Sequence, residues 1–196
     1  MTQIISLEKE YDKAFAEAKK VLFAGGVVIY PTDTVYGIGG DARKKEVVTR
    51  VRKIKGKEKS APFSILLGGI GMVKEYALVE GRAVKAVMEV FPGATTLILK
   101  AKRELPLVKD GKIGVRVPEH IFMRKLSLEL GMPILTTSAN LSGERAPGSL
   151  NEVGKKVLEK ADLAIDGGKT LYGIPSTIVD VVDKKVIRTG AGEIVF

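Results

Sequence analysis

The sequence predicts an α/β fold built on a mixed sheet. Short apolar runs typical of strands alternate with segments in which apolar residues recur at helical spacing. Links short enough for hairpins lie near Asp183 and within residues 97–117, which favours a mixed sheet over an all-parallel one. The chain has 196 residues and no evident linker, so we expect one domain over residues 1–196.

In the first half of the chain, Ser6 can cap a helix that runs to Ala24, where Gly25 ends it. A buried strand over residues 27–30 ends at Pro31, which has no N–H for a ladder. A basic helix over residues 44–54 leads to a short strand at 63–67 and a turn at 68–71. Helical spacing returns over residues 84–91, and a strand follows at 95–100.

In the second half, strands are expected at residues 113–117, 133–137, 163–166, 177–182 and 186–188. Helices are expected at 119–130 and 149–160, the second opened by the capping box Ser149-Leu150-Asn151-Glu152. Polar residues follow the strands that end at Tyr30 and Leu135, but they precede the strand that begins at Thr177. All of them meet at one edge only if that last strand runs opposite to the others.

Composition narrows the class of protein. The net charge of +9 favours an anionic partner such as a nucleotide or RNA, although a solvated lysine-rich surface would look the same. The absence of cysteine excludes disulfides and thiolate metal sites, and the single histidine, His120, makes a histidine-based triad or metal site improbable. No apolar run is long enough to span a membrane, and we expect a cytoplasmic protein.

Residues 27–41, which read VVIYPTDTVYGIGGD, combine a buried strand with a hydroxyl-rich and glycine-rich loop. Glycines allow a ligand to approach the backbone, and hydroxyls donate and accept hydrogen bonds. A strand followed by an ordinary polar turn would give the same pattern. This stretch alone therefore does not distinguish a ligand-binding loop from a turn.

Other segments supply candidate ligand groups. Lys55 and Lys57 flank Gly56 in a basic run over residues 50–59, which suits a di- or triphosphate but also suits a solvated helix end. Small polar residues occupy positions 136–140 and 175–177, as in a phosphate site or a plain turn. Two arginines within strands, Arg116 and Arg188, suggest bound anions or structural ion pairs.

The usual phosphate-binding loops, GxxxxGK[ST] and GxGxxG, are absent from the sequence. No nucleophile with a partner base is evident either. A site rich in cations and hydroxyls therefore indicates phosphoryl or nucleotidyl transfer through positioning and charge neutralisation.

Taken in order, several of these segments resemble the YrdC family, the threonylcarbamoyl-adenylate synthases. The resemblance rests on PTDTVYG at residues 31–37, KGK at 55–57, TSAN at 137–140, PSTIVD at 175–180 and Arg188, and it covers essentially the whole chain. It implies a twisted, open mixed sheet flanked by helices around one large basic cavity.

The resemblance also implies a reaction, in which L-threonine, bicarbonate and ATP give threonylcarbamoyl-adenylate and pyrophosphate with Mg2+. The product feeds the machinery that transfers threonylcarbamoyl to adenosine in tRNA. By position, the catalytic residues would be Lys55, Lys57, Ser138 and Asn140. Threonine would be held by Thr34, Arg116, Thr136 and Ser176. ATP would be bound by Lys55, Lys57, Lys59, Ser138, Asn140, Ala146 and Arg188, and its phosphates, rather than protein side chains, would hold Mg2+.

This sequence departs from the family pattern at two positions. Lys57 stands where arginine is usual, which keeps the charge but loses the bidentate fork. Leu66 stands where many members carry a histidine near the amino-acid site, which leaves amino-acid selectivity open. Two other functions therefore stay open: a module of the same fold that binds double-stranded RNA or tRNA, and carbamoyl-adenylate chemistry on another substrate.

Overall fold

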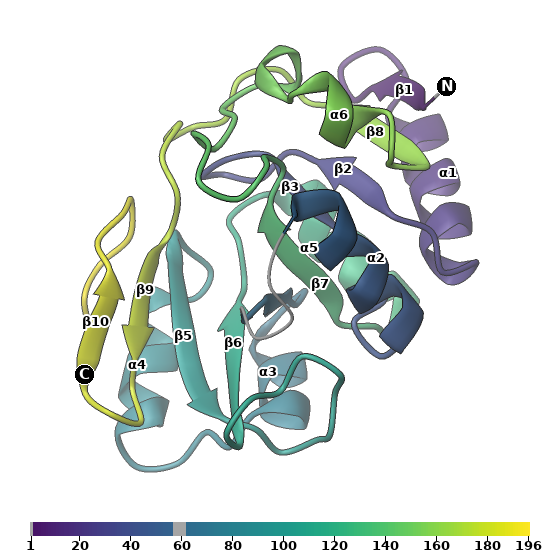
Figure 1. The fold of residues 1–196 in the computed structure, drawn as a ribbon. Coiled ribbons are helices and arrows are strands. Elements are labelled where there is room, and N and C mark those ends of the chain that lie inside the picture. The colour runs from purple at the N-terminus through teal and green to yellow at the C-terminus, as the bar shows by residue number, and fades with distance from the viewer. Residues whose placement is uncertain (1, 57–61) are drawn as a thin grey trace.

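A computed structural model describes residues 2–56 and 62–196 of the protein. Within this part of the chain, ten strands form one sheet in the order β1-β8-β2-β3-β7-β4-β6-β5-β9-β10 (Figure 1). The strands are β1 (Gln3–Ser6), β2 (Val28–Tyr30), β3 (Gly37–Gly39), β4 (Ser64–Leu66), β5 (Thr95–Lys100), β6 (Lys112–Arg116), β7 (Ile134–Ser138), β8 (Leu163–Asp166), β9 (Thr177–Asp180) and β10 (Lys185–Arg188). The helices are α1 (Tyr11–Phe23), α2 (Lys45–Lys55), α3 (Ile70–Tyr76), α4 (Arg82–Val90), α5 (Ile121–Leu130), α6 (Lys155–Leu158) and the 3-10 turn η1 (Leu150–Glu152).

The sheet mixes parallel and antiparallel pairs, which confirms the predicted α/β class. β1, β8 and β2 are parallel neighbours, whereas β3 and β7 each run antiparallel to both of their neighbours. The condition for the polar residues to meet at one edge, that the strand beginning at Thr177 runs opposite to the others, is not met. When direction is followed from one hydrogen-bonded pair to the next, β9 runs in the same sense as β7.

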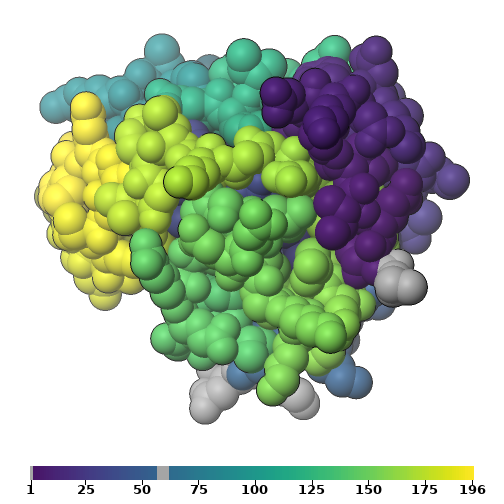
Figure 2. Space-filling model, turned by 90° about the horizontal axis from the view of Figure 1, so that it is seen from above, coloured from purple at the N-terminus to yellow at the C-terminus, as the bar shows by residue number. Residues whose placement is uncertain are grey.

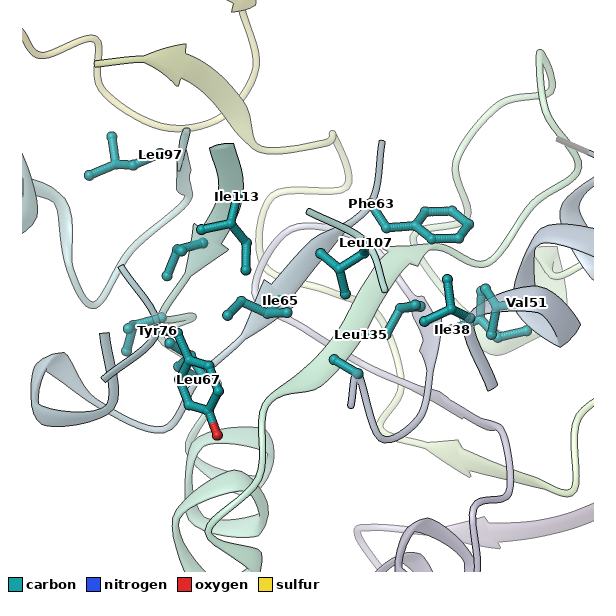
Figure 3. Packing of buried hydrophobic residues seen from close by; sticks show 14 of the residues in the cluster. Ile38, Val51, Phe63, Ile65, Leu67, Tyr76, Leu97, Leu107, Ile113 and Leu135 are labelled. Carbon is teal, nitrogen blue, oxygen red and sulfur yellow. The ribbon is translucent and has the colours of Figure 1, made fainter. Parts of the chain in front are cut away.

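Two apolar clusters hold the helices to the sheet. The larger one packs α2, α3 and α4 against it and contains Ile38, Ile65 and Leu135 (Figure 3). The smaller one packs α1 and α5 against the sheet and contains Leu66. Successive residues of a strand point to opposite faces, so Ile65 and Leu66 enter different clusters and β4 is buried on both sides. No helix in the described ranges is long and apolar enough to cross a membrane.

The structure differs from the sequence-based expectation near the N-terminus. Residues Gln3–Ser6 form β1 beside β8, and α1 begins at Tyr11 instead of Ser6. In β1 only Ile5 is buried, so the sequence of this strand lacks the alternation of apolar and polar residues that would predict it. The expected glycine loop contains β3, where Gly39 lies against β7. A Cβ atom at Gly39 would lie 1.6 Å from the carbonyl oxygen of Leu135, so this close approach of two strands requires glycine.

Two further expectations were wrong. Residues 68–71 do not form only a turn, because α3 begins at Ile70. Residues 149–160 do not form one helix, because η1 and α6 are separated by an extended residue at Val153. The capping box does not form: Glu152 accepts a hydrogen bond from the backbone N–H of Gly148 (2.8 Å), and Ser149 makes no side-chain cap.

Candidate active site

A cavity of about 280 Å³ is bordered by the loop after β2, the end of α2 and strands from the middle of the sheet. Eight of the residues that the sequence singles out line it: Thr34, Lys55, Arg116, Thr136, Ser138, Asn140, Ser176 and Arg188. Ala146 is not among the lining residues, so its contact with ATP stays a prediction. Lys57 and Lys59 lie outside the described residues.

Strand register explains why residues distant in sequence share this cavity. Ser64 on β4 pairs with Thr136 on β7, and both side chains border the cavity. β5 and β6 pair at Leu97 and Val115, which places Thr96 beside Arg116. All four side chains therefore lie on one face of the twisted sheet, and the polar residues meet across that face instead of at a single edge.

Lys55 connects α2 to the segment that leaves β7. It is the last residue of α2, and its side chain points into the protein, so that the residue is only 2% exposed. The Nζ atom donates hydrogen bonds to the carbonyl oxygen of Ser138 and to two oxygens of Asn140, the carbonyl (2.8 Å) and Oδ1 (3.4 Å). Three buried donors on one cation thus fix the backbone of this segment at the cavity wall.

The segment after β7 is also fixed by Asn140 itself. Its Nδ2 donates to the carbonyl oxygens of Leu141 (2.9 Å) and Glu144 (2.7 Å), which closes a tight turn. Ser142 donates its backbone N–H to the carbonyl oxygen of Lys55 (3.0 Å). Lys55 at the end of α2 thus both donates hydrogen bonds to this turn and accepts one from it. These bonds hold Ser138 and Asn140 in a defined position beside the cavity.

Arg116 is buried at the end of β6 and faces the cavity. Its guanidinium donates to the Oδ1 atom of Asp33 (2.7 Å), the hydroxyl of Thr34 (2.6 Å) and the carbonyl oxygen of Gly93 (3.2 Å). Burial lowers the pKa of Arg116 from its usual value, and the Asp33 carboxylate offsets part of that shift. The residue thus combines a structural ion pair with a position on the cavity wall, where the sequence left these two roles as alternatives.

Ser176, just before β9, is held from two sides. Its hydroxyl shares a hydrogen bond with that of Thr96 (2.9 Å), and Arg188 donates to its carbonyl oxygen (2.8 Å) and hydroxyl (3.2 Å). Burial lowers the pKa of Arg188, and so does the positive charge of Arg116. Two guanidinium groups close enough to repel each other border one cavity, which is an arrangement that an anionic ligand would stabilise.

The charge of the cavity wall is uniformly positive in the part that the structure describes. Lys55, Arg116 and Arg188 line it, and no carboxylate does so among the described residues. The carboxylate of Asp33 lies next to Arg116 but is not part of the wall. Since hydroxyls make up much of the remaining polar lining, the site suits a ligand that carries several negative charges.

Residues 167–176 join β8 to β9 and cross the molecule beside the cavity; Figure 2 shows this yellow-green segment running from the C-terminal strands toward the N-terminal part. Tyr36 holds the segment: its hydroxyl donates to the carbonyl oxygen of Gly168 (2.8 Å) and accepts from the N–H of Gly167 (2.9 Å). Burial raises the pKa of Tyr36 to about 12, so the phenol remains a donor at neutral pH. Tyr172 adds a backbone bond to Asp33 (2.9 Å).

Sequence reasoning missed three lining residues with polar side chains: Ser64, Thr96 and Ser142. The only signal for Ser64 and Thr96 is a hydroxyl inside an otherwise apolar strand, which also occurs on ordinary half-buried strands. Leu66 does not line the cavity and is 1% exposed in the smaller core cluster. Within the described part of β4, Ser64 is the residue that borders the cavity.

His120 stands directly before α5, and its Nδ1 atom is buried without a hydrogen-bond partner in the described structure. Burial lowers the pKa of the imidazole below 6.5, and the Asp33 carboxylate offsets part of this shift. We expect the ring to titrate below pH 6.5 in an NMR titration, which is unambiguous because the chain has one histidine. A pKa at or above 6.5 would contradict this burial.

The lowered pKa has a consequence for stability. Between the folded pKa and 6.5 the unfolded chain binds the proton more readily, so the contribution of His120 is present above pH 6.5 and is lost as pH falls through the folded pKa. His120→Gln should reduce the loss of stability over this window, as measured by denaturant unfolding at a series of pH values.

No group of three or more histidine, cysteine or acidic residues that could hold a metal ion occurs within the described ranges. Hydroxyls and the amide of Asn140 are the neutral oxygen donors of the wall. Such groups can hydrogen-bond to the water shell of a Mg2+ ion that a phosphate ligand brings with it.

Comparison with known proteins decides the family. The sequence profile of the Sua5/YciO/YrdC family, which is described as "Telomere recombination", matches residues 20–190. The chain belongs to this family. A protein of Methanocaldococcus jannaschii named putative threonylcarbamoyl-AMP synthase is 39% identical over 188 residues, which cover 95% of this chain and 89% of that relative.

Two solved structures of the Sua5/YciO/YrdC family confirm the predicted fold. Escherichia coli YciO superposes with a TM-score of 0.88 at 30% identity, and the match covers 98% of both chains. Pyrococcus abyssi Sua5, complexed with L-threonine, superposes with a TM-score of 0.85 at 28% identity. That match covers 97% of this chain but 57% of Sua5, so the chain spans little more than half the length of that relative.

Proposed function

We propose that the protein is a threonylcarbamoyl-AMP synthase. It would convert L-threonine, bicarbonate and ATP into threonylcarbamoyl-AMP and pyrophosphate, for transfer of the threonylcarbamoyl group to tRNA. The observation that carries this proposal is a cavity that gathers three cations and many hydroxyls from distant parts of the chain. Further support comes from the relatives, one of which is named for this activity and another of which is crystallised with L-threonine.

The amino-acid end of the cavity would lie at Arg116. A guanidinium is a natural partner for the threonine carboxylate, because it can bind both oxygens. The hydroxyls of Thr34, Thr136 and Ser176 border the same cavity and can bind the remaining polar groups of the amino acid. None of these four residues needs to act as a nucleophile.

ATP would occupy the end of the cavity near Lys55, Ser138 and Asn140, with Arg188 on the phosphates. The threonine amine would first add to the carbon of bicarbonate, and water would leave to give a carbamate. A carbamate oxygen would then attack the α-phosphorus of ATP, and pyrophosphate would leave with its bond electrons. Mg2+ would arrive with ATP and neutralise phosphate charge, while Lys55 and, by resemblance, Lys57 would stabilise the charge of the leaving group.

The wall favours the carbamate over free threonine. The α-ammonium group would find no carboxylate among the described lining residues, whereas the carbamate replaces that positive charge with a negative one. We therefore expect bicarbonate to increase the affinity for threonine several-fold, and threonine to increase that for bicarbonate by the same factor. Calorimetric titration with and without bicarbonate, in the absence of ATP, measures this coupling. Equal affinities would contradict the preference for the carbamate.

The direct test of the activity is pyrophosphate release by the purified protein. We expect release to require ATP, L-threonine, bicarbonate and Mg2+ together, and to fall to background when any one is omitted. Replacement of threonine by other amino acids or by carbamoyl phosphate in the same assay tests carbamoyl-adenylate chemistry on another substrate. Release that requires one of these replacements, and not threonine, would overturn the proposed substrate.

The net charge of +9 also suits an RNA-binding module. Binding through phosphate contacts weakens steeply with salt. A synthase whose substrates occupy a buried cavity should keep much of its turnover at salt concentrations that release RNA. Tight, salt-sensitive RNA binding without any turnover would favour the RNA-binding function instead.

A further inference from the structure

We propose that Asp33 is a positioning residue, which orients the guanidinium of Arg116 toward the carboxylate of the amino-acid substrate. This inference rests on the proposed function and adds a residue to it. Asp33 does not line the cavity, and its carboxylate lies behind Arg116, 2.7 Å from the Nη2 atom. It is therefore placed to act through Arg116 instead of touching the substrate.

The hydrogen bonds of Arg116 leave a defined pair of donors. Of the five guanidinium N–H groups, Asp33, Thr34 and Gly93 each occupy one, on Nη2, Nη1 and Nε respectively. Among the described residues, one N–H therefore remains without a partner on each terminal nitrogen. Two donors on a side chain that borders the cavity are enough to bind both oxygens of a carboxylate.

The surroundings of Asp33 favour a role in this pairing over a role in stability. Its Oδ2 atom is buried and has no hydrogen-bond partner among the described residues, and its side chain is 3% exposed. A buried carboxylate with an unpartnered oxygen is unfavourable for stability, and a buried ion pair often contributes little to it. What the pair does provide is a fixed direction for the guanidinium.

The backbone of Asp33 is itself held in place. Its carbonyl oxygen accepts a hydrogen bond from the N–H of Tyr172 (2.9 Å), and the carbonyl oxygen of Thr34 accepts one from the hydroxyl of Thr170 (2.8 Å). The segment between β8 and β9 thus supports the loop that carries Asp33. A carboxylate on a fixed backbone can orient Arg116, whereas one on a free loop would follow it.

Two substitutions separate positioning from simple charge neutralisation. Asp33→Ala removes both the acceptor and the charge, and Asp33→Asn keeps an acceptor for Arg116 without the charge. Positioning predicts that the Kd for L-threonine rises by about tenfold or more in Asp33→Ala and by less in Asp33→Asn. If Asp33 only neutralised Arg116, Asp33→Asn would bind threonine more tightly than the wild type.

Asp41 provides the matched control. It is also a buried aspartate, 2% exposed, and its carboxylate accepts two hydrogen bonds from the guanidinium of Arg43 (2.8 Å each). Neither residue of that pair lines the cavity. Asp41→Ala should therefore lower the melting temperature without changing threonine affinity.

The experiment is calorimetric titration of L-threonine into each variant without bicarbonate, so that no turnover occurs, together with an ATP titration and a thermal melt. We expect the Kd for ATP to stay within about twofold of wild type, and Asp33→Ala to add almost nothing in an Arg116→Met background.

Wild-type threonine affinity in Asp33→Ala, tighter binding in Asp33→Asn, or an equal loss in Asp41→Ala would overturn the inference. If Asp33→Ala does not fold, Asp33→Asn carries the test, with a raised Kd expected. Failure of the wild type itself to bind threonine would instead count against the proposed function.

Discussion

Replacement of Lys55 by alanine is expected to abolish adenylate formation. Loss of a fixed positive charge beside the ATP phosphates should remove about 2 to 4 kcal/mol of transition-state stabilisation, which is roughly 30-fold to 900-fold in rate. The structure adds a second cause. Without the Nζ atom, the carbonyl oxygens of Ser138 and Asn140 lose a buried donor, so the cavity wall itself becomes less ordered.

Lys53 is the control for this substitution, since it lies two residues earlier on α2, is exposed and does not line the cavity. Lys53→Ala removes the same charge from the helix and should leave the rate of pyrophosphate release near that of the wild type. Thermal melts of both variants separate loss of the site from loss of the fold. Near-normal turnover in Lys55→Ala would remove this residue from the site.

Arg116→Met is expected to weaken threonine binding by about 2 kcal/mol, roughly 30-fold, because the substrate carboxylate loses a charged, bidentate donor. The affinity for ATP in the absence of threonine should change little. The same substitution leaves the buried carboxylate of Asp33 without its cation, so we also expect the free energy of unfolding to fall by about 3 kcal/mol or more.

Arg43→Met separates these two effects. It breaks an ion pair with a buried aspartate, Asp41, at a site that does not border the cavity. It should lower stability and leave threonine affinity unchanged in a calorimetric titration. If Arg116→Met behaves in the same way, Arg116 is only the structural partner of Asp33 and does not bind the amino acid.

Most of the sheet could be predicted because its strands are apolar and their ends carry clear signals. The strand at Thr95–Lys100 was predicted with the bounds that the structure shows, and the other central strands lie within one or two residues. β1 and β3 were missed for physical reasons. β1 buries only Ile5, and β3 is a glycine strand whose pairing depends on the close approach of β7, which local sequence does not reveal.

The candidate site could be listed from the sequence but not assembled. Hydroxyls beside strand ends and a cation at the end of the basic helix were sufficient to name Thr34, Ser176 and Lys55 as candidates, and the cavity brings them together. The sequence did not predict where these residues meet, because that depends on strand register and twist, which are properties of the whole sheet. The Arg116–Asp33 pair joins residues 83 positions apart, and nothing local in the sequence predicts it.

If the proposed function is right, one cavity joins threonine, bicarbonate and ATP. The most direct measurement is mass spectrometry of the product formed from isotope-labelled bicarbonate, L-threonine and ATP. We expect an adenylate that contains both threonine and the labelled carbon, formed in step with pyrophosphate and absent from the Lys55→Ala reaction. An adenylate without the label, or pyrophosphate release that is independent of threonine, would contradict it.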